Sequence, residues 1–236
     1  MRAVILAGGT GSRLRPFTFT IPKPLVPIGE MPIIEILIRQ LAGQGFDRIT
    51  ISVGHLASLI RAVCGDGSHW GVEVDYVEEE QPLGTAGGLS LIKDLGGAPV
   101  LVINGDTLTD LDFAAAVRKH SPEAGITICT NRREVAIDFG VLQVADDGLL
   151  LGYREKPTLE YLVSMGVYVV SDWVIEEYIP EGERLDMPDL IRGLIENGHP
   201  VRTHDADAYW LDLGRIDDLE QGDSVFRSER ARFLPD

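Results

Sequence analysis

The chain is poor in cysteine and histidine, and this scarcity argues against several kinds of site. Only two cysteines, Cys64 and Cys129, occur in 236 residues, far apart and without a neighbouring thiol. No disulfide framework or cysteine-ligated zinc site is indicated, so we expect reduced, partly buried thiols that pack as small apolar residues. The five histidines stand singly, without an HExxH pattern, which argues against a histidine metal centre.

Positive charge and long apolar runs are also scarce. The sequence has 21 Lys and Arg against 37 Asp and Glu, a formal net charge of −16. Nucleic acids and anionic membranes need clustered basic residues, so we expect neither as a partner. No apolar run approaches the ~18–20 residues that span a bilayer, and the short run at 3–7 does not make a signal peptide. The expected location is the cytoplasm.

What the sequence does contain is an ordinary globular composition, 44% hydrophobic and 25% charged, with strands and helices in alternation. The predicted strands are 3–7, 48–53, 72–77, 99–103, 125–130, 140–144, 149–154, 164–170, 201–204 and 209–213. The predicted helices are 32–42, 55–63, 86–95, 112–119, 172–178, 187–197 and 216–230. The alternation favours an open, mostly parallel sheet covered on both faces, and the strand-rich second half suggests antiparallel additions. Without a repeat or a linker, residues 1–236 are expected to form a single domain.

A glycine-rich turn, GGTGS at 8–12, follows the first strand. Such a turn presents backbone N–H groups to an anion, although a tight turn without a ligand needs glycine as well. The dinucleotide fingerprint fails because Gly9 and Gly11 are followed by Leu14 where a third glycine is required. The P-loop fails too, because Ser12 and Arg13 stand where Gly-Lys-Ser/Thr would continue.

Two cations follow this turn. Arg13 comes directly after the glycines, and Lys23 lies between Pro22 and Pro24. Prolines on both sides are expected to hold the Lys23 backbone extended and stiff, which would aim its ammonium group at a fixed point. The alternative is that both are solvated surface cations.

The stretch at 6–27, LAGGTGSRLRPFTFTIPKPLVP, strongly resembles the signature of the sugar-1-phosphate nucleotidyltransferases, also called nucleotide-sugar pyrophosphorylases. The resemblance recurs at PLGTAGG (82–88), NGD (104–106), EKP (155–157) and WLDLG (210–214). It implies a Rossmann-like three-layer αβα fold with a mixed, mostly parallel central sheet. It also implies the reaction of an NTP with a sugar 1-phosphate, which gives an NDP-sugar and pyrophosphate.

The resemblance assigns roles to individual residues. Arg13, Lys23, Asp106 and Asp212 would be catalytic, and the two aspartates would hold Mg²⁺. Asp106 also follows a buried strand, at the edge where open α/β sheets bind ligands, although an aspartate there can equally cap a helix or a turn. The residues expected to bind the nucleotide are Leu6, Ala7, Gly8, Gly9, Thr10, Gly11, Ser12, Gln81, Gly84 and Thr85.

The expected sugar-phosphate contacts are Gly140, Glu155, Lys156 and Ser164. The EKP motif suggests that Lys156 grips the phosphate and that Glu155 bonds sugar hydroxyls; without the resemblance it would be an ordinary turn. Ser164 departs from the family, which usually has an asparagine there. Because serine lacks the two-ended amide, the sugar is expected to be an unusual one.

The nucleotide is expected to be GTP, because PLGTAGG and MPDLI at 187–191 look closest to mannose- and heptose-1-phosphate guanylyltransferases. The sugar would then be a mannose-, heptose- or other higher-carbon-sugar 1-phosphate. A thymidylyl- or uridylyltransferase acting on a hexose 1-phosphate is the alternative. A non-catalytic nucleotide-sugar sensor and a dinucleotide-dependent oxidoreductase are the competing classes. The 21 residues after Arg215 are expected to hold one helix and no second enzyme, and assembly into a homo-oligomer is left open.

Overall fold

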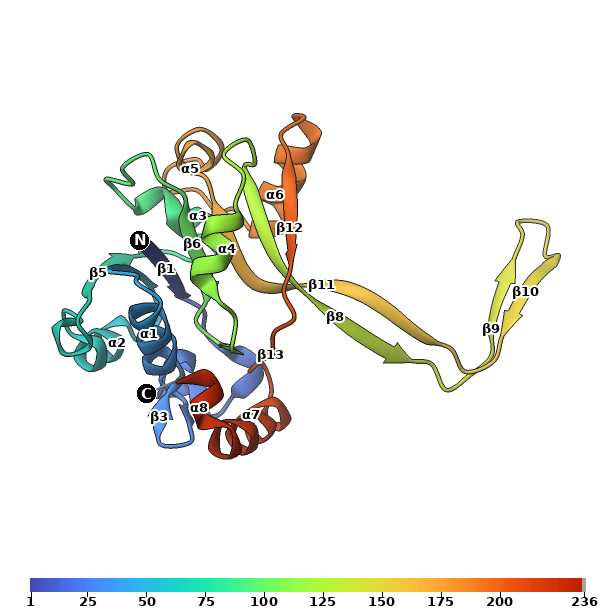
Figure 1. Ribbon diagram of the computed structural model, residues 1–236, viewed down its shortest axis with the longest axis horizontal. Helices are drawn as coiled ribbons and strands as arrows, with labels where there is room; N and C mark the ends of the chain where they lie inside the picture. Colours follow the sequence, from blue (N-terminus) through green and yellow to red (C-terminus); the bar gives the residue numbers. More distant parts are fainter. Residues whose placement is uncertain (235–236) are drawn as a thin grey trace.

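The chain alternates strands with helices in its first half and is richer in strands in its second (Figure 1). The computed structural model describes residues 1–234. Its strands are β1 (Arg2–Ala7), β2 (Pro27–Ile28), β3 (Met31–Pro32), β4 (Arg48–Val53), β5 (Glu73–Glu78), β6 (Val100–Asn104), β7 (Thr107–Thr109), β8 (Ile126–Ala136), β9 (Val141–Val144), β10 (Leu150–Arg154), β11 (Thr158–Val170), β12 (Val201–Asp205) and β13 (Trp210–Asp212). Its α-helices are α1 (Ile33–Gly43), α2 (Ala57–Cys64), α3 (Gly84–Gly87), α4 (Phe113–Lys119), α5 (Asp172–Tyr178), α6 (Met187–Glu196), α7 (Ile216–Ser228) and α8 (Arg230–Phe233). Short 3₁₀ turns are η1 (Ser12–Leu14), η2 (Phe17–Phe19), η3 (Lys23–Leu25), η4 (Ser68–Trp70) and η5 (Gly88–Leu91).

Seven strands form the central sheet, in the order β12-β8-β11-β6-β1-β4-β5. Strands β6, β1, β4 and β5 are parallel to their neighbours in this series, and β12 is parallel to β8. Strand β11 is antiparallel to both β6 and β8. The predicted fold class, a mixed and mostly parallel sheet between helical layers, is therefore confirmed.

The two faces of the sheet bury different hydrophobic clusters. Along β1, Ala3 and Ile5 point to the cluster formed with α1, α2 and α4, whereas Val4 points to the cluster formed with α3, α5 and α6. Successive strand side chains face opposite sides, so a strand covered on both faces must be apolar throughout. Full burial of an Ile or Val side chain contributes about 1.5–3 kcal/mol, which makes the two-sided cover the main stabilising element. A third cluster packs α7 and α8 against β2 and β3.

Most predicted elements are present within one or two residues of the expected bounds. The one helix expected after Arg215 is divided into α7 and α8, and four further segments differ. The predicted helix at 86–95 is only α3 followed by η5, which ends at Leu91. Lys23 is not extended: it begins η3, in which the N–H of Leu25 donates to the carbonyl of Pro22 (2.8 Å). The fixed φ of proline suits the second position of such a turn. Finally, β8 and β11 are much longer than predicted.

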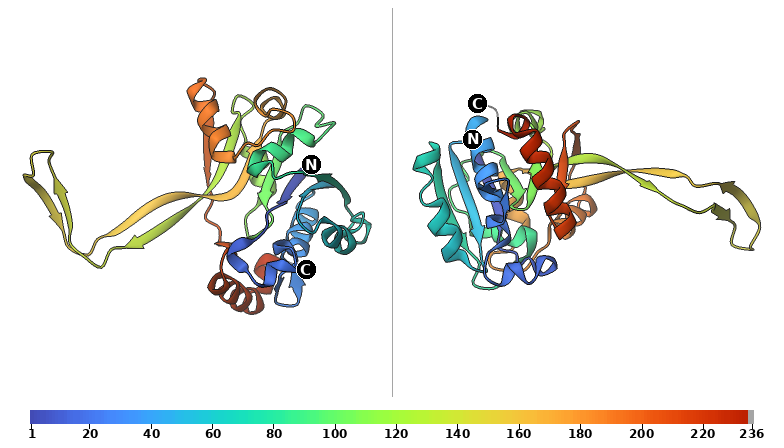
Figure 2. Two further views of the ribbon diagram at one scale, coloured as in Figure 1. Left: turned by 180° about the vertical axis from the view of Figure 1, so that it is seen from behind. Right: turned by 90° about the horizontal axis from the view of Figure 1, so that it is seen from below.

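The extra length of β8 and β11 forms a two-stranded projection from the body of the protein (Figures 1 and 2). The ladder runs outward from the pair Asn131–Val163 to the pair Ala136–Thr158, and β9 and β10 form an antiparallel hairpin at its end. The sequence predicted strands in this region but gave no sign of the projection, because alternating side chains fit a strand with or without a core beneath it.

The scarce residues behave as the composition suggests. Cys64 and Cys129 are both free and buried, and burial raises the pKa of each thiol to about 12. Among residues 1–234, no helix has the length and apolar character needed to cross a membrane.

A buried histidine joins α4 to the sheet. His120 Nδ1 lies 2.8 Å from Thr127 Oγ1, and Nε2 lies 2.9 Å from Ser171 Oγ. Since the Ser171 hydroxyl donates to the carbonyl of Ala124 (2.7 Å), it accepts from Nε2–H, which leaves Nδ1 to accept from Thr127. Neutral imidazole is thus fully bonded, and burial lowers the pKa of His120 below its ordinary value of 6.5.

We expect this histidine to make the protein less stable in mild acid. As the pH falls through 6.5, an unfolded His120 takes up a proton that the folded one resists, so the free energy of unfolding falls, by at most about 1.4 kcal/mol per pH unit. Urea unfolding at pH 7.5 and 5.5 should show a larger loss for the wild type than for His120→Gln, which cannot titrate. Equal losses in the two proteins would contradict this account.

Candidate functional site

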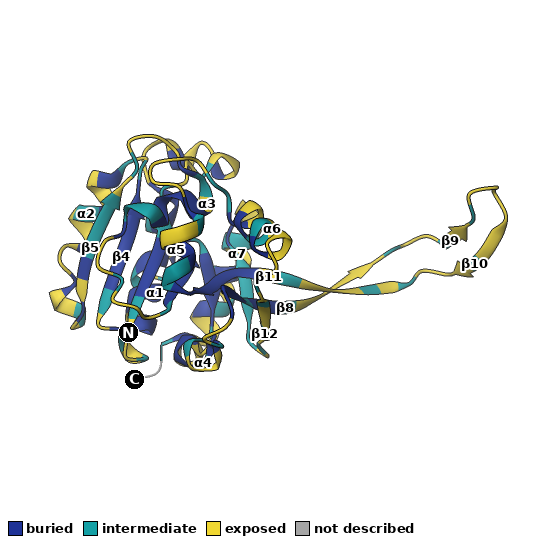
Figure 3. Cartoon of the chain, turned by 90° about the horizontal axis from the view of Figure 1, so that it is seen from above, coloured by how far each residue is buried: buried dark blue, intermediate teal, exposed yellow. Residues whose placement is uncertain are grey.

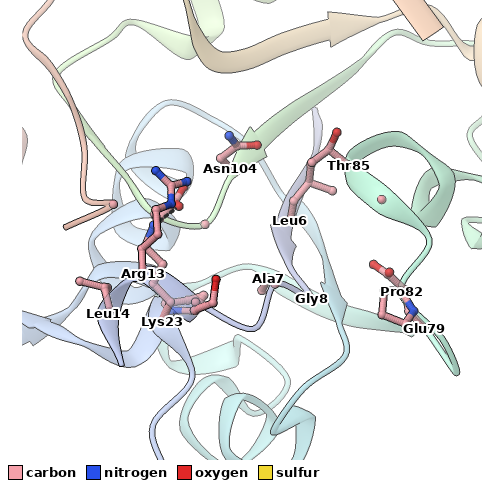
Figure 4. Close-up of a pocket in the computed structure, with 18 residues that line it drawn as sticks. Leu6, Ala7, Gly8, Arg13, Leu14, Lys23, Glu79, Pro82, Thr85 and Asn104 are labelled. Carbon is pink, nitrogen blue, oxygen red and sulfur yellow. Dashed lines mark hydrogen bonds and ion pairs between the residues drawn. The ribbon is translucent and has the colours of Figure 1, made fainter. Parts of the chain in front are cut away.

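A pocket of about 390 Å³ opens at the carboxyl ends of β1, β5 and β6 (Figure 4). Parallel strands end at the same edge of a sheet, so the loops that follow them meet there. The residues that line the pocket are Leu6, Ala7, Gly8, Gly9, Gly11, Ser12, Arg13, Leu14, Lys23, Pro24, Glu79, Pro82, Gly84, Thr85, Asn104, Gly105, Asp106 and Gly214. Most of the residues expected to bind the nucleotide are in this set; Thr10 and Gln81 are not.

The glycine-rich turn lines the pocket with four of its residues, of which Gly8 lies between Lys23 and Glu79 (Figure 4). Within the described chain, the N–H groups of Gly9, Thr10 and Gly11 donate to no other backbone or side-chain group, so they remain available to an anion. Gly8 approaches Glu79 closely: a Cβ at position 8 would lie 2.9 Å from Glu79 Oε1.

One end of the pocket gathers opposite charges. Buried Lys23 is hydrogen-bonded through its ammonium to Asp106, and its Nζ lies 3.9 Å from Asp212 Oδ1. Strand β13 brings Asp212 there, because Asp212 pairs with Thr107 of β7 and the N–H of Leu213 donates to the carbonyl of Asp106 (3.0 Å). Arg13 reaches the same place: a Cβ on Gly214 would lie 3.2 Å from Arg13 Nη1 and 3.1 Å from Asp212 Oδ2.

This charge arrangement fits a divalent cation. Burial first, and then the nearby carboxylate of Asp106, raises the pKa of Asp212, while Lys23 and Arg13 oppose the rise. An added cation would relieve the repulsion between the two carboxylates. In the part of the chain that is described, no three acidic, histidine or cysteine side chains gather around one point. A cation between Asp106 and Asp212 would therefore take its other ligands from water and substrate oxygens, as Mg²⁺ commonly does.

The other end of the pocket is formed by the segment after β5 (Figure 4). Glu79 accepts hydrogen bonds from Ser52 Oγ (2.8 Å) and from the N–H of Leu83 (2.9 Å), which fixes its carboxylate at this end. Thr85 Oγ1 accepts from the N–H of Met187 (2.7 Å), so its hydroxyl proton and one lone pair remain for a ligand. Gln81 is exposed and does not line the pocket.

The residues expected to bind the sugar phosphate are not gathered at the pocket. Gly140, Glu155 and Lys156 lie on the projection, and none of them lines the pocket. Glu155 accepts instead from the hydroxyl of Tyr153 (2.5 Å). Ser164 lies where the projection leaves the sheet, and its hydroxyl donates to the hydroxyl of Tyr168 (3.1 Å).

Two polar lining residues were missed by the sequence reasoning. Glu79 is the first residue after β5, and Asn104 is the last residue of β6. Their position at the carboxyl ends of parallel strands is the signal that would have found them, because that edge of the sheet collects ligand contacts.

The sequence matches that of known proteins over most of its length. The model of the family described as nucleotidyl transferase matches residues 2–228. A UTP–glucose-1-phosphate uridylyltransferase from Synechocystis sp. is 37% identical over 241 residues, covering 94% of this chain and 62% of that protein. A mannose-1-phosphate guanylyltransferase from Mycobacterium tuberculosis is 32% identical over 228 residues, covering 93% of this chain and 63% of that protein. The chain thus spans less than two thirds of the length of both relatives.

A solved structure shares the architecture. The crystal structure of HddC from Yersinia pseudotuberculosis, complexed with GMP-PN, superposes with a TM-score of 0.72 at 26% sequence identity. The match covers 95% of this chain and 99% of that one, so it includes nearly every element described above.

The close approach of Gly8 to Glu79 generates a matched pair of substitutions. We expect Gly8→Ala to destabilise the protein by about 1–3 kcal/mol, because its Cβ must displace the hydrogen-bonded carboxylate of Glu79. Gly9→Ala should leave stability unchanged or slightly raised, because nothing lies within 4 Å of its Cβ. Denaturant unfolding of both variants without ligand tests this, and a Gly9→Ala loss as large as that of Gly8→Ala would refute the assignment.

Proposed function

Because this chain belongs to the nucleotidyl transferase family, we propose that it transfers a nucleoside monophosphate group from an NTP to a sugar 1-phosphate. The products are a nucleotide sugar and pyrophosphate. The observation that carries the proposal is the division of the pocket: unbonded backbone N–H groups at 9–11 lie beside Arg13, Lys23 and two aspartates, and a separate polar end lies beyond. The pocket thus offers one end to phosphates and one to a base.

The chemical step needs charge neutralisation more than proton transfer. An oxygen of the sugar phosphate forms a bond to the α-phosphorus of the nucleotide, and the bond from that phosphorus to the pyrophosphate oxygen breaks. The attacking oxygen belongs to an ionised phosphate near neutral pH, so no general base is required. Two polyanions must meet, and the leaving group gains charge, so positioning and electrostatic stabilisation dominate the rate.

The cations of the pocket meet these needs in different ways. Arg13 is exposed and forked, so it can bind two phosphate oxygens of the departing pyrophosphate together with the N–H groups of the turn. Lys23 is buried and held by Asp106 and Asp212, so its charge stays in a fixed place near the α-phosphate. A fixed charge costs no reorganisation when negative charge develops, which is the requirement for stabilising a transition state.

We assign Mg²⁺ to Asp106 and Asp212. When bound, the ion supplies positive charge to the reacting phosphates. The two carboxylates fit such an ion because both lie near the ammonium group of Lys23 and therefore near each other. Burial, and then Asp106, raises the pKa of Asp212, and an added cation would oppose this rise.

We propose guanine as the base. Guanine presents two adjacent donors, its N1–H and its 2-amino group, and a carboxylate accepts both. Glu79 places a carboxylate at the end of the pocket away from Lys23, with lone pairs left after its bonds to Ser52 and Leu83. Uracil and thymine offer a single donor between two carbonyl groups, which suits a carboxylate less well. The GMP-PN complex of HddC and the guanylyltransferase relative support the same choice, whereas the uridylyltransferase relative favours UTP.

The sugar belongs to the same proposal. We infer a mannose-, heptose- or other higher-carbon-sugar 1-phosphate, with Glu155 and Lys156 as the contacts to it and Ser164 as the departure from the usual asparagine. We treat the sheet, its helices and the projection as one catalytic domain. The free, buried thiols are compatible with a reducing cytoplasm as its location.

Loss of either aspartate should nearly abolish turnover. We expect Asp106→Asn and Asp212→Asn each to lower kcat by at least ~100-fold, the scale for removing one strong electrostatic stabiliser. Pyrophosphate release with Mg²⁺ measures the rate, and a chelator should stop the wild-type reaction.

The matched control is Asp207→Asn, which removes an exposed carboxylate near Asp212 in the sequence and should retain wild-type turnover. Near-normal turnover of a folded Asp212→Asn protein would show that this aspartate holds no essential cation.

The base assignment is tested by comparing nucleotides with one accepted sugar phosphate. We expect kcat/KM for GTP to exceed that for UTP, dTTP and CTP by at least ~10-fold, because a wrong base leaves Glu79 without its donors. Glu79→Gln should narrow this preference, because an amide oxygen accepts from one donor while the amide nitrogen opposes the other. A clear preference for UTP or dTTP would reject guanine and leave the reaction class intact.

A further inference from the structure

The projection, which we call the arm (residues 132–164), has no core of its own. No residue from Arg132 to Ser164 is buried, and the arm is exposed along its length (Figure 3). Ten of its large apolar side chains are exposed, among them Phe139, Leu142, Leu149, Leu150, Leu151 and Tyr161. A typical monomer exposes contiguous apolar patches of only about 300–600 Å², so side chains of this kind mark a surface that another molecule covers.

Side-chain contacts at the base of the arm hold it pointing away from the body. Arg132 bonds Glu160 across the ladder (2.7 Å) and Asp205 of β12 (2.6 Å). Asn131 Nδ2 donates to the carbonyl of Ala208 (3.0 Å). Beyond this base, the strand from Ser164 to Thr158 spans about 20 Å. All three views show the arm leading away from the body (Figures 1 and 2).

The junction between the long ladder and the β9–β10 hairpin carries a polar cluster that, within residues 1–234, makes no hydrogen bond or ion pair to the body. The hydroxyl of Tyr153 donates to Glu155 Oε2 (2.5 Å), and its ring packs so closely on Gly140 that a Cβ there would lie 2.2 Å from that hydroxyl. Lys156, the next residue after Glu155, has a positive φ of 42°, which is uncommon for a lysine. None of these residues is buried.

The lining of the pocket carries no net positive charge. Its lining has two cations, Arg13 and Lys23, against two anions, Glu79 and Asp106. Lys23 is further neutralised by Asp212. A triphosphate and a sugar phosphate bring about six negative charges, so Arg13, Lys23 and the one Mg²⁺ assigned above leave a deficit that a further cation would reduce.

We propose that two copies of this chain exchange arms, so that the arm of each copy covers the pocket of the other and brings Glu155 and Lys156 to its sugar-phosphate end. This rests on the proposed function. A two-fold pair gives both copies the same contact, as domain swapping does at low cost. The clamp at Arg132 and Asn131 opposes folding of the arm back onto its own pocket.

A receiving surface lies beside the pocket. Phe17, Phe19 and Ile21 are exposed between Arg13 and Lys23 in the sequence, and Arg15 packs over the ring of Phe19 (5.1 Å to its centroid). These side chains match the apolar residues of an incoming arm. Each arm exposes ten large apolar side chains that a partner can cover, and an interface of standard size buries about 1,600 Å².

The test is complementation between two damaged proteins. Lys156→Ala damages the arm and Asp212→Asn damages the body. Each is refolded alone and in an equal mixture, and pyrophosphate release is measured at low sugar phosphate. In the equal mixture, half of all dimers contain one chain of each variant. In each of these dimers, one of the two sites has both an intact body and an intact arm. We expect the mixture to regain about a quarter of wild-type activity, while neither variant alone does. No recovery beside an active wild type would show that the arm acts on its own chain.

A second measurement does not depend on activity. Light scattering should give the mass of a dimer, and Leu151→Glu should weaken the dimer at least tenfold. Ile195→Glu on α6, where the native residue is also 58% exposed, is the matched control and should leave the dimer intact. A wild-type monomer, or equal effects of the two substitutions, would overturn arm exchange. If the wild type transfers no nucleotide to any sugar phosphate, the proposed function fails, and this measurement still decides whether the arms pair.

Discussion

The pocket depends on the balance between the ammonium of Lys23 and the carboxylates of Asp106 and Asp212. Burial first, and then the carboxylate of Asp106, raises the pKa of Asp212, while Lys23 and Arg13 oppose the rise. The arrangement is stable because the sheet imposes it: β7 and β13 pair so that both aspartates come to one place, and η3 brings Lys23 between them. Under the proposed function, a divalent cation between the two aspartates would offset the repulsion between their carboxylates.

The same sheet edge separates the two ends of the pocket. The turn at 8–12 leaves β1 with unbonded N–H groups, while Glu79 leaves β5 with its carboxylate held by Ser52 and Leu83. Gly8 allows the two segments to touch, since any side chain there would meet Glu79. Charge recognition and recognition of a flat, polar group can therefore occur in one cavity of about 390 Å³ without competing for the same residues.

The body and the arm divide the remaining requirements. The body buries its apolar residues in two layers against the sheet and keeps few cations at the pocket. The arm does the opposite: none of its residues is buried, ten of its large apolar side chains are exposed, and Glu155 and Lys156 lie in its turn between β10 and β11. A protein with a net charge of −16 cannot attract phosphates through its overall field, so the few cations it has must be placed by structure.

The sequence by itself determined the layers of the fold, and its resemblance to a known family indicated the two aspartates that meet at Lys23. The apolar runs at 3–7 and 99–103 form strands with mostly buried side chains, and the glycines and Arg13 follow the first strand directly, so local pattern was sufficient for these elements. Only the tertiary structure decided the contacts between distant segments. Strand register pairs Asp212 with Thr107 and places Glu155 and Lys156 on the arm. The packing of distant segments decides that Glu79 lines the pocket and that Gln81 does not. Alternating side chains specify a strand and the face of it that is buried. They do not specify which helix, strand or second molecule covers that face.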